Sequence, residues 1–268
     1  MQREVALIVG TGPSLSASLA RLFAKEGMAV ALAARNIAKL GDLVRHTSAR
    51  AYPCDATQAG EVTRLFEAVN QDLGTPDLVV YNAGGRVRGP LTELDPQEVE
   101  RALRVSCFGG FLVAREAARG MLARGSGTLL FTGASASVKG YANSSSFAMG
   151  KFGLRGLAQA LARELHPQNI HVGHIVIDGG IAAPGDTRRG DRGSDGFLHP
   201  DEIAKTYLQL HRQHRSAWAW EIELSAVGFD VGGQPIGIDL GIPGPAQAVD
   251  QDATSLLREF RDKRDKNR

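Results

Sequence analysis

The chain has 268 residues, 43% of them hydrophobic, and its 31 basic and 29 acidic residues leave a formal net charge of +2. This near balance argues against a dedicated nucleic-acid-binding protein, which usually carries a strong basic excess. Cys54 and Cys107 have neither metal-ligand spacing nor a disulfide pattern, and the histidines are scattered, so no metal site is predicted. No apolar run approaches the roughly 20 residues of a membrane span, and the apolar start is too short for a signal peptide. We therefore expect a cytoplasmic protein without a membrane or nucleic-acid partner.

Short apolar runs alternate along the chain with longer segments of helical periodicity. The predicted strands are Val5–Val9, Ala29–Ala34, Leu78–Tyr81, Gly127–Thr132, Ile170–Ile177 and Trp218–Leu224. The predicted helices are Ser14–Glu26, Gln58–Leu73, Pro96–Arg124, Ser144–Leu165 and Pro200–Arg212. Pro96 and Pro200 suit the first turn of a helix, and Asp95 suits an N-cap position.

Continuously apolar strands are typical of a parallel sheet that is covered on both faces. Their alternation with helices indicates right-handed βαβ units. The sequence therefore predicts an α/β fold, a single doubly wound Rossmann-type domain with a mainly parallel sheet flanked by helices on both faces. We expect this dinucleotide-binding domain over residues 1–224, and a C-terminal extension over 225–268 that either packs on the domain or is partly disordered. The Gly-, Asp- and Arg-rich stretch Gly179–His199 fits a disordered loop or a mobile flap over a ligand equally well.

The first predicted strand leads into the first helix through a turn of small residues. Gly10 and Gly12 match the first two glycines of G-x-G-x-x-G, with Leu15 at the third position. Alternatively, Gly10, Ser14 and Ser16 fit the spacing G-x-x-x-G-x-G. Small residues let the backbone approach a pyrophosphate, and the free amides of a helix N-terminus attract its charge. The turn therefore predicts a dinucleotide site.

The end of the second predicted strand bears on the choice of dinucleotide. NAD sites usually have an acidic residue there, which binds the ribose 2′-hydroxyl. This chain has Ala34 and then Arg35, whose guanidinium suits a 2′-phosphate. An exposed arginine that opens the next helix is the alternative interpretation. We expect NADP(H) to be favoured over NAD(H).

Taken together, these segments resemble the short-chain dehydrogenase/reductase family over roughly residues 4–224. Cys54–Asp55 looks like the family's adenine-contacting aspartate, and Tyr81–Gly84 looks like its Asn-Asn-Ala-Gly motif. Phe147–Lys151 falls where the family has Tyr-x-x-x-Lys, and Asp178–Ile181 falls at its Pro-Gly turn beside the nicotinamide. The resemblance, with the turn and Arg35, implies these cofactor-binding residues: Gly10, Gly12, Ser14, Leu15, Arg35, Asp55, Ala56, Asn82, Ala83, Gly84, Lys151, Gly179 and Ile181.

The resemblance breaks at the catalytic positions. In the family a tyrosine passes the proton, a lysine holds the ribose, a serine polarises the carbonyl and an asparagine supports a proton relay. Here Lys151 is kept, whereas Phe147, Ala134 and Ser106 fall at the tyrosine, serine and asparagine positions, which makes the chain a divergent member. The first candidate for a replacement catalytic group is Ser135; the others are Tyr141, Ser144, Ser145, Ser146 and Asp178, each of which also reads as a loop polar residue or a cap.

The helix that carries Lys151 is expected to be packed, not exposed, because Phe152, Leu154 and Leu157 follow the lysine. Residues 147 and 151 share one face of this helix because they lie four residues apart. The family forms dimers or tetramers through its two long helices, which implies a homo-oligomer here. The apolar residues that fit either such an interface or the core are Phe108, Phe111, Leu112 and Phe152.

Two functions fit these observations. The first is an NADP(H)-dependent oxidoreductase that acts on a carbonyl, alcohol or activated alkene with an atypical active site. The second is a catalytically silent NADP(H)-binding protein that serves as a regulator or scaffold. Lys151 favours the enzyme, and the three altered positions favour the silent protein.

Overall fold

The computed structural model describes residues 3–183 and 196–226. Seven strands form one sheet in the order β3-β2-β1-β4-β5-β6-β9, and every neighbouring pair runs parallel. The strands are β1 (Val5–Val9), β2 (Ala29–Ala34), β3 (Arg50–Pro53), β4 (Leu78–Tyr81), β5 (Gly127–Thr132), β6 (Ile170–Asp178) and β9 (Glu221–Ser225). From β1 the chain builds outward to β3 and then returns to place β4 on the other side of β1. The predicted doubly wound α/β fold is confirmed.

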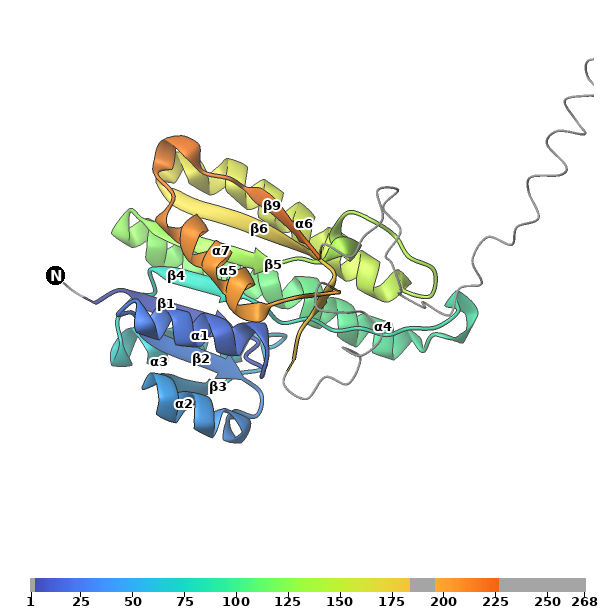
Figure 1. Cartoon of the computed structure of the whole chain (residues 1–268), viewed down its shortest axis with the longest axis horizontal. Helices are drawn as coiled ribbons and strands as arrows, with labels where there is room; N and C mark the ends of the chain where they lie inside the picture. The colour runs from blue at the N-terminus through green and yellow to red at the C-terminus, as the bar shows by residue number, and fades with distance from the viewer. Residues whose placement is uncertain (1–2, 184–195, 227–268) are drawn as a thin grey trace, which may run out of the picture. The chain divides into compact units, whose positions relative to one another are not determined.

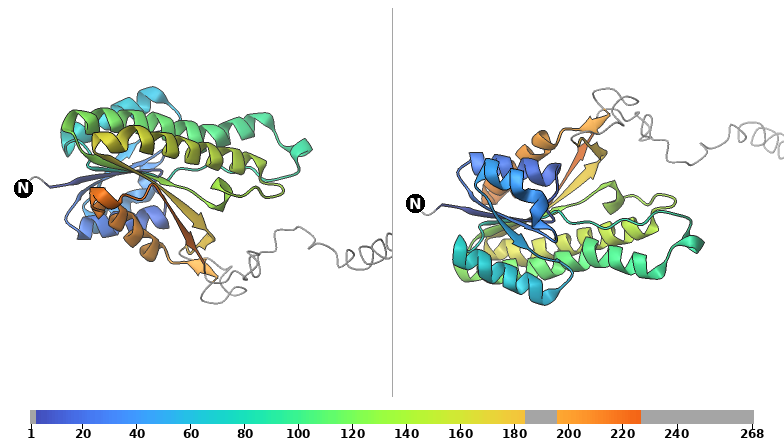
Figure 2. Two further views of the ribbon diagram at one scale, coloured as in Figure 1. Left: turned by 90° about the horizontal axis from the view of Figure 1, so that it is seen from above. Right: turned by 90° about the horizontal axis from the view of Figure 1, so that it is seen from below.

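Helices cover both faces of this sheet (Figures 1 and 2). They are α1 (Leu15–Lys25), α2 (Gly41–Thr47), α3 (Ala59–Asp72), α4 (Pro96–Leu103), α5 (Gly109–Arg124), α6 (Ser145–Leu165) and α7 (Pro200–Arg212). One apolar cluster joins α3, α5 and α6 to one face of the sheet, and a second joins α1 and α7 to the other. No helix of the described residues is both long enough and apolar enough to cross a membrane.

Most of the predicted elements are present within one or two residues. Asp95 caps α4, since its Oδ1 accepts a hydrogen bond of 2.8 Å from the amide of Gln97. Pro96 and Pro200 each open a helix, as expected. The last strand, β9, begins at Glu221 and not at Trp218, because Trp218 directly follows a short 3₁₀ turn (η7, Arg215–Ala217).

Three further features differ from the prediction. Strand β3 was not among the predicted strands because it is only four residues long and holds an exposed arginine and proline. Helix α2 and the preceding 3₁₀ turn (η1, Ile37–Leu40) were also missed. The single helix predicted over Pro96–Arg124 is interrupted by a π turn (η3, Arg104–Phe108), where the buried hydroxyl of Ser106 bonds to a neighbouring segment.

The stretch after β6 is partly described. Strand β7 (Gly180–Ile181) pairs in parallel with β8 (Phe197–Leu198), so the two ends of this stretch lie together. The predicted flap or loop falls largely on residues 184–195, and the predicted C-terminal extension largely on 227–268; both lie outside the described residues.

Candidate active site

The predicted site residues meet at one edge of the sheet. Because the strands are parallel, their carboxyl ends share this edge. Gly10 follows β1, Arg35 follows β2, Asn82 follows β4, Ala134 lies just beyond β5 and Gly179 follows β6. The order of strands reverses between β1 and β4, and this switch point is where open α/β sheets bind their ligands.

Gly10 must be a glycine for two reasons. Its φ angle is +88°, and a Cβ atom at this position would lie 2.4 Å from the backbone nitrogen of Ala83. The amides of Gly10 and Thr11 both donate to the carbonyl of Ala33, at 3.0 and 3.1 Å. By contrast, a Cβ on Gly12 would meet nothing within 4 Å. The protein itself therefore leaves the space beside Gly12 open.

The N-terminus of α1 presents free backbone donors. No described residue accepts a hydrogen bond from the amides of Leu15 and Ser16, and Ser14 caps the helix without a side-chain bond. The Ser14 hydroxyl instead donates to the carbonyl of Ala182, at 2.8 Å. Leu15 buries its side chain in the core, so its side chain does not take part in binding. Free amides at a helix start favour an anion.

Asn82 ties the two strands of the switch point together. Its backbone amide donates to the carbonyl of Val9 at 2.8 Å. Its side-chain amide donates to the hydroxyl of Ser16 at 2.7 Å, and that hydroxyl donates to the carbonyl of Gly10 at 3.1 Å. The serine at position 16 is therefore more than a small residue, because its hydroxyl is part of this network.

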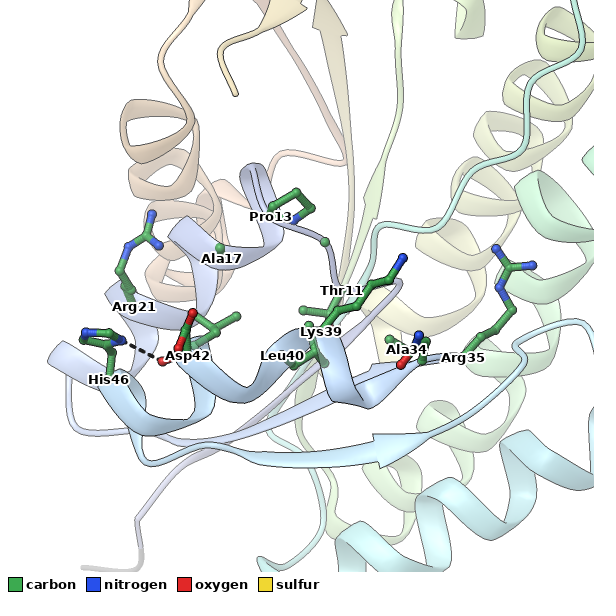
Figure 3. A pocket seen from close by; sticks show the side chains of 13 residues that line it. Thr11, Pro13, Ala17, Arg21, Ala34, Arg35, Lys39, Leu40, Asp42 and His46 are labelled. Carbon is green, nitrogen blue, oxygen red and sulfur yellow. Dashed lines mark hydrogen bonds between the residues drawn. The ribbon is translucent and has the colours of Figure 1, made fainter. Parts of the chain in front are cut away.

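A cavity of about 610 Å³ opens between the turn after β1 and the segment after β2. Its lining includes Thr11 and Gly12 from the turn after β1, and Arg35 and Lys39 from the segment after β2 (Figure 3). Arg35 and Lys39 are exposed and form no ion pair with any residue that the structure describes. Arg21, at the far end of the pocket, is engaged with Asp201 at 3.5 Å. Two unpaired cations beside free helix amides make this pocket suitable for a polyanion.

Asp55 is held in a fixed turn after β3. Its Oδ1 accepts from the amide and hydroxyl of Thr57, at 2.9 and 2.8 Å, and its own amide donates to Glu61 at 2.8 Å. Ala56 is buried beside it and packs against α5, where a Cβ on Gly109 would lie 2.9 Å from the Ala56 carbonyl oxygen. Cys54 is buried, which raises the pKa of its thiol to about 11. The aspartate is therefore fixed in position, whereas the cysteine is inert.

Lys151 is buried, with 5% of its surface exposed, and is not a surface lysine. Its ammonium group donates a hydrogen bond of 2.7 Å to the carbonyl of Thr132 at the end of β5. A Cβ on Gly84 would lie 3.7 Å from the lysine nitrogen, so the motif after β4 runs directly past this ammonium. Burial lowers the pKa of Lys151 from 10.5 to about 8.

Phe147 lies one turn before Lys151 and faces the same region. The lysine nitrogen is 5.9 Å from the centre of the Phe147 ring. The guanidinium of Arg86, two residues beyond Gly84, lies 4.6 Å from the same centre. The ring is therefore flanked by two cations, and the side chain carries no group that can transfer a proton.

Ser106 occupies the π turn and is fully buried. Its hydroxyl accepts from the amide of Gly85 at 2.9 Å and donates to the Gly85 carbonyl at 3.0 Å. A Cβ on Gly150 would lie 2.6 Å from that of Ser106, so α6 packs closely against the π turn. The serine therefore fixes the loop after β4 next to Lys151, a role the sequence did not indicate.

The candidate proton donors differ in their hydrogen-bond and ion-pair partners. Ala134 carries no polar side chain, whereas the half-buried Ser135 has a hydroxyl without a hydrogen-bond partner in residues 3–183 and 196–226. The Ser146 hydroxyl is engaged with the backbone of Val87, at 2.9 and 3.2 Å. Asp178 is buried and paired with Lys139 at 3.0 Å. Ser135 therefore differs from Ser146 and Asp178 in that its polar side chain has no partner among the described residues.

The segment after β6 is anchored to β8 and to the second apolar cluster. Gly179 has a φ angle of +150°, and a Cβ there would lie 2.7 Å from a methyl carbon of Leu198. Ile181 packs against the second apolar cluster and pairs with Leu198 in the small sheet. Glycine is therefore required at position 179, and Ile181 is held between the second apolar cluster and β8.

Sequence reasoning missed Lys39 and Arg86. Lys39 lies four residues after Arg35, within a 3₁₀ turn that was not predicted. Arg86 follows the Gly84–Gly85 pair directly, so its place in the chain was a usable signal, but its stacking on Phe147 depends on the tertiary fold. The described residues hold no group of three or more His, Cys, Asp and Glu side chains that could bind a metal ion.

Comparison with known proteins places the chain among oxidoreductases. Residues 4–189 match the family described as short chain dehydrogenase. Sorbitol-6-phosphate 2-dehydrogenase of Escherichia coli is 29% identical over 189 residues, covering 68% of this chain and 73% of that protein. A short-chain dehydrogenase of Rhodopseudomonas palustris is 34% identical, with a TM-score of 0.72 over 84% of this chain and 99% of that one. An alcohol dehydrogenase of Thermococcus sibiricus, complexed with 5-hydroxy-NADP, is 23% identical and shares the fold, with a TM-score of 0.74 over 84% and 97% of the two chains.

Proposed function

Because this chain belongs to the short chain dehydrogenase family, we propose that it is an NADP(H)-dependent oxidoreductase acting on a carbonyl, alcohol or activated alkene. The observation that carries the proposal is the pair of unpaired cations, Arg35 and Lys39, in the cavity beside the free amides of α1. The cofactor, when bound, supplies or accepts the hydride. The protein's part is to hold it, to orient the substrate and to manage the proton.

The residues present fit a dinucleotide. The amides of Leu15 and Ser16 and the open space at Gly12 suit the pyrophosphate, and we assign Asp55 and Ala56 to contact the adenine. Lys151 is fixed beside Gly84 and suits the ribose next to the nicotinamide. The segment around Asn82, Ala83, Gly179 and Ile181 then forms the remaining wall of the proposed cofactor site.

Arg35 and Lys39 favour NADP(H) over NAD(H). Two cations without partners are stabilised by the additional 2′-phosphate, which NAD(H) lacks. The adjacent Asn36 uses its side chain to cap the 3₁₀ turn, at 3.1 Å from the amide of Ala38, and so keeps the two cations on one short turn. The Thermococcus sibiricus relative was solved with an NADP derivative, which agrees with this preference.

We propose an atypical proton donor for this enzyme. Phe147 has no exchangeable proton, and Ala134 has no hydroxyl with which to polarise a carbonyl. The free hydroxyl of Ser135, one residue after Ala134, is the group we assign to bind the substrate oxygen, with water as the source of the proton. Since a general acid contributes roughly 10²–10⁴-fold to rate, we expect slow reduction of simple ketones.

A silent NADP(H)-binding protein is the second candidate. The observation that favours it is the stacking of Arg86 on Phe147, which fills the position from which a proton would be delivered. Such a protein would bind NADPH as tightly but would produce no alcohol from any carbonyl compound. Single-turnover assays with NADPH and a panel of ketones, aldehydes and oxo acids separate the two functions.

We also propose that the protein is a homo-oligomer that associates through α5 and α6. Phe108, Phe111 and Phe152 expose 44%, 43% and 43% of their surface, which is unusual for phenylalanine. The rings of Phe108 and Phe111 lie 6.0 Å apart. Leu112, by contrast, is 3% exposed and belongs to the core, so of the four residues considered from the sequence it does not contribute to the interface.

The test of the proposed function is calorimetric titration of the full chain with NADPH and NADH. We expect NADPH to bind at least tenfold more tightly, and Arg35→Ala and Lys39→Ala to weaken NADPH binding while leaving NADH binding nearly unchanged. Arg64→Ala is the matched control, since Arg64 is an exposed arginine outside the cavity. Equal affinities for the two cofactors would contradict the assignment of NADP(H), and binding of neither would contradict the function.

A further inference from the structure

Arg86 is an arginine without an acidic partner next to the proposed reaction site. Its guanidinium lies 4.6 Å from the centre of the Phe147 ring, a distance typical of a cation–π contact. None of the acidic side chains in the described parts of the chain forms an ion pair with it. The side chain is exposed, so a ligand from solvent can reach it. This cation is therefore both oriented and available.

Two buried serines fix the backbone on either side of Arg86. Ser106 accepts from the amide of Gly85 and donates to its carbonyl, at 2.9 and 3.0 Å. Ser146 does the same for Val87, at 3.2 and 2.9 Å. Both serines have 0% of their surface exposed. Four hydrogen bonds from α6 and the π turn therefore hold the backbone on both sides of Arg86.

The charges around Arg86 are positive. Arg88 lies two residues further along the same segment, and Lys151 lies 5.9 Å from the ring on which Arg86 stacks. Partial desolvation and the like charge of Arg88 hold the pKa of Arg86 below its usual range. An anion at this position would relieve the repulsion and satisfy the guanidinium donors, which match a carboxylate in a bidentate arrangement.

We propose that Arg86 binds a carboxylate group of the substrate, so that the enzyme acts on oxo acids or hydroxy acids. The proposal rests on the proposed function, because it places the reacting carbon near Phe147 and Lys151. Phe147 then serves as the platform that aims the guanidinium, and not as a reacting group. The planar fork of an arginine favours carboxylate over a neutral carbonyl compound of the same size.

The experiment uses the full chain saturated with NADPH and two matched series of probes. The acids are 2-oxobutanoate, 3-oxobutanoate and 4-oxopentanoate, and the uncharged partners are their methyl esters. Calorimetry is expected to show binding of at least one acid, with its ester at least tenfold weaker. Arg86→Gln should weaken the binding of that acid at least tenfold and change the binding of its ester less than twofold. Arg86→Lys keeps the charge but loses the planar guanidinium, so its affinity for the acid should lie between those of the wild-type protein and Arg86→Gln.

Arg88→Gln is the matched control, because Arg88 is an exposed arginine on the same segment whose side chain has no partner among residues 3–183 and 196–226. We expect it to change acid binding less than threefold. Each variant is first titrated with NADPH, whose affinity should be unchanged. Binding of NADPH without binding of any acid, equal affinity for acids and esters, or equal effects of Arg86→Gln and Arg88→Gln would overturn this proposal. Failure of the wild-type protein to bind NADPH would contradict the proposed function itself.

Discussion

The ammonium group of Lys151 donates a hydrogen bond to the backbone carbonyl of Thr132, at 2.7 Å, and has no acidic partner among the described residues. Burial therefore acts on this lysine without a compensating negative charge and lowers its pKa from 10.5 to about 8. In the window between these two pKa values the unfolded chain keeps the proton and the folded chain releases it. The folded protein is consequently favoured as the pH rises through this window.

Comparison with Lys151→Met should reveal how the stability of the wild-type protein depends on pH. Relative to the variant, the wild-type protein should gain up to about 1.4 kcal/mol of unfolding free energy per pH unit between about pH 8 and pH 10. Below about pH 8 both states hold the proton and the difference should be constant. Urea denaturation of both proteins at several pH values measures this difference. Lys205→Met, at an exposed lysine paired with Glu202, should give a nearly flat difference, and a flat result for position 151 would contradict the effect of burial.

Gly10→Ala and Gly12→Ala form a matched pair on one turn. The first places a Cβ at a φ angle of +88° and against the backbone of Ala83, so we expect a loss of at least about 2 kcal/mol of stability. The second meets no protein atom within 4 Å and should change stability by less than about 0.5 kcal/mol. Calorimetry on the stable Gly12 variant should still show weaker NADPH binding. Unchanged binding would mean that the pyrophosphate does not approach this glycine.

Ser106→Ala and Ser146→Ala should each loosen the segment that carries Arg86. Each variant leaves a backbone amide, of Gly85 or Val87, without its acceptor, at a cost of roughly 1–3 kcal/mol. Hydrogen exchange resolved to single amides should accelerate more at the amide that has lost its acceptor than at the amides of the sheet. Ser145→Ala is the control, since the Ser145 hydroxyl bonds to no other described residue. Equal effects at positions 145 and 146 would show that the buried hydroxyl does not anchor Val87.

Phe147→Tyr, combined with Ala134→Ser, restores the two hydroxyls that the family carries at these positions. The new phenol would sit on a ring that is already 5.9 Å from the Lys151 nitrogen. We expect kcat/KM for NADPH-dependent reduction of a ketone or oxo acid to rise at least tenfold, toward the roughly 10²–10⁴-fold value of a general acid. Phe152→Tyr, on the exposed side of α6, should not change the rate. No gain despite normal NADPH binding would mean that the pocket is not organised for carbonyl reduction.

Phe111→Asp with Phe152→Asp should dissociate the proposed oligomer. Charges introduced on α5 and α6 would oppose burial of this apolar surface against a second copy. Sedimentation velocity should show the variant at the mass of one chain and the wild-type protein at a multiple of it. Leu91→Asp, at a residue outside these two helices with 77% of its surface exposed, should leave the mass unchanged. A wild-type protein that sediments as one chain would contradict the oligomer.

The buried strands could be predicted well because they are continuously apolar. Val5–Val9 and Leu78–Tyr81 have the same bounds in the sequence and in the structure, since both are covered on two faces. Strand β3 was missed because a four-residue edge strand with Arg50 and Pro53 exposed has little apolar signal. The π turn was missed because apolar periodicity continues on both sides of it.

The residues proposed to face the cofactor could be predicted from the sequence because they directly follow predicted strands. Gly10 and Asn82 each follow a strand directly, and parallel topology brings them to one edge. The contacts of Ser106, Ser146 and Arg86 could not be anticipated, since each joins residues that are far apart in the chain. A serine that anchors a distant backbone has no local pattern that distinguishes it from a serine on a surface helix.

Because of the π turn at Arg104–Phe108, the position of Ser106 depends on the exact number of residues in this part of the chain. A π turn holds more residues than the α-helical turn it replaces, and one residue rotates a helix by about 100°. Removing a single residue here would force a choice between two orientations of the segment. One keeps the apolar side chains of α5 against the sheet, and the other keeps Ser106 on Gly85. This stretch should therefore accept many substitutions more readily than a one-residue deletion.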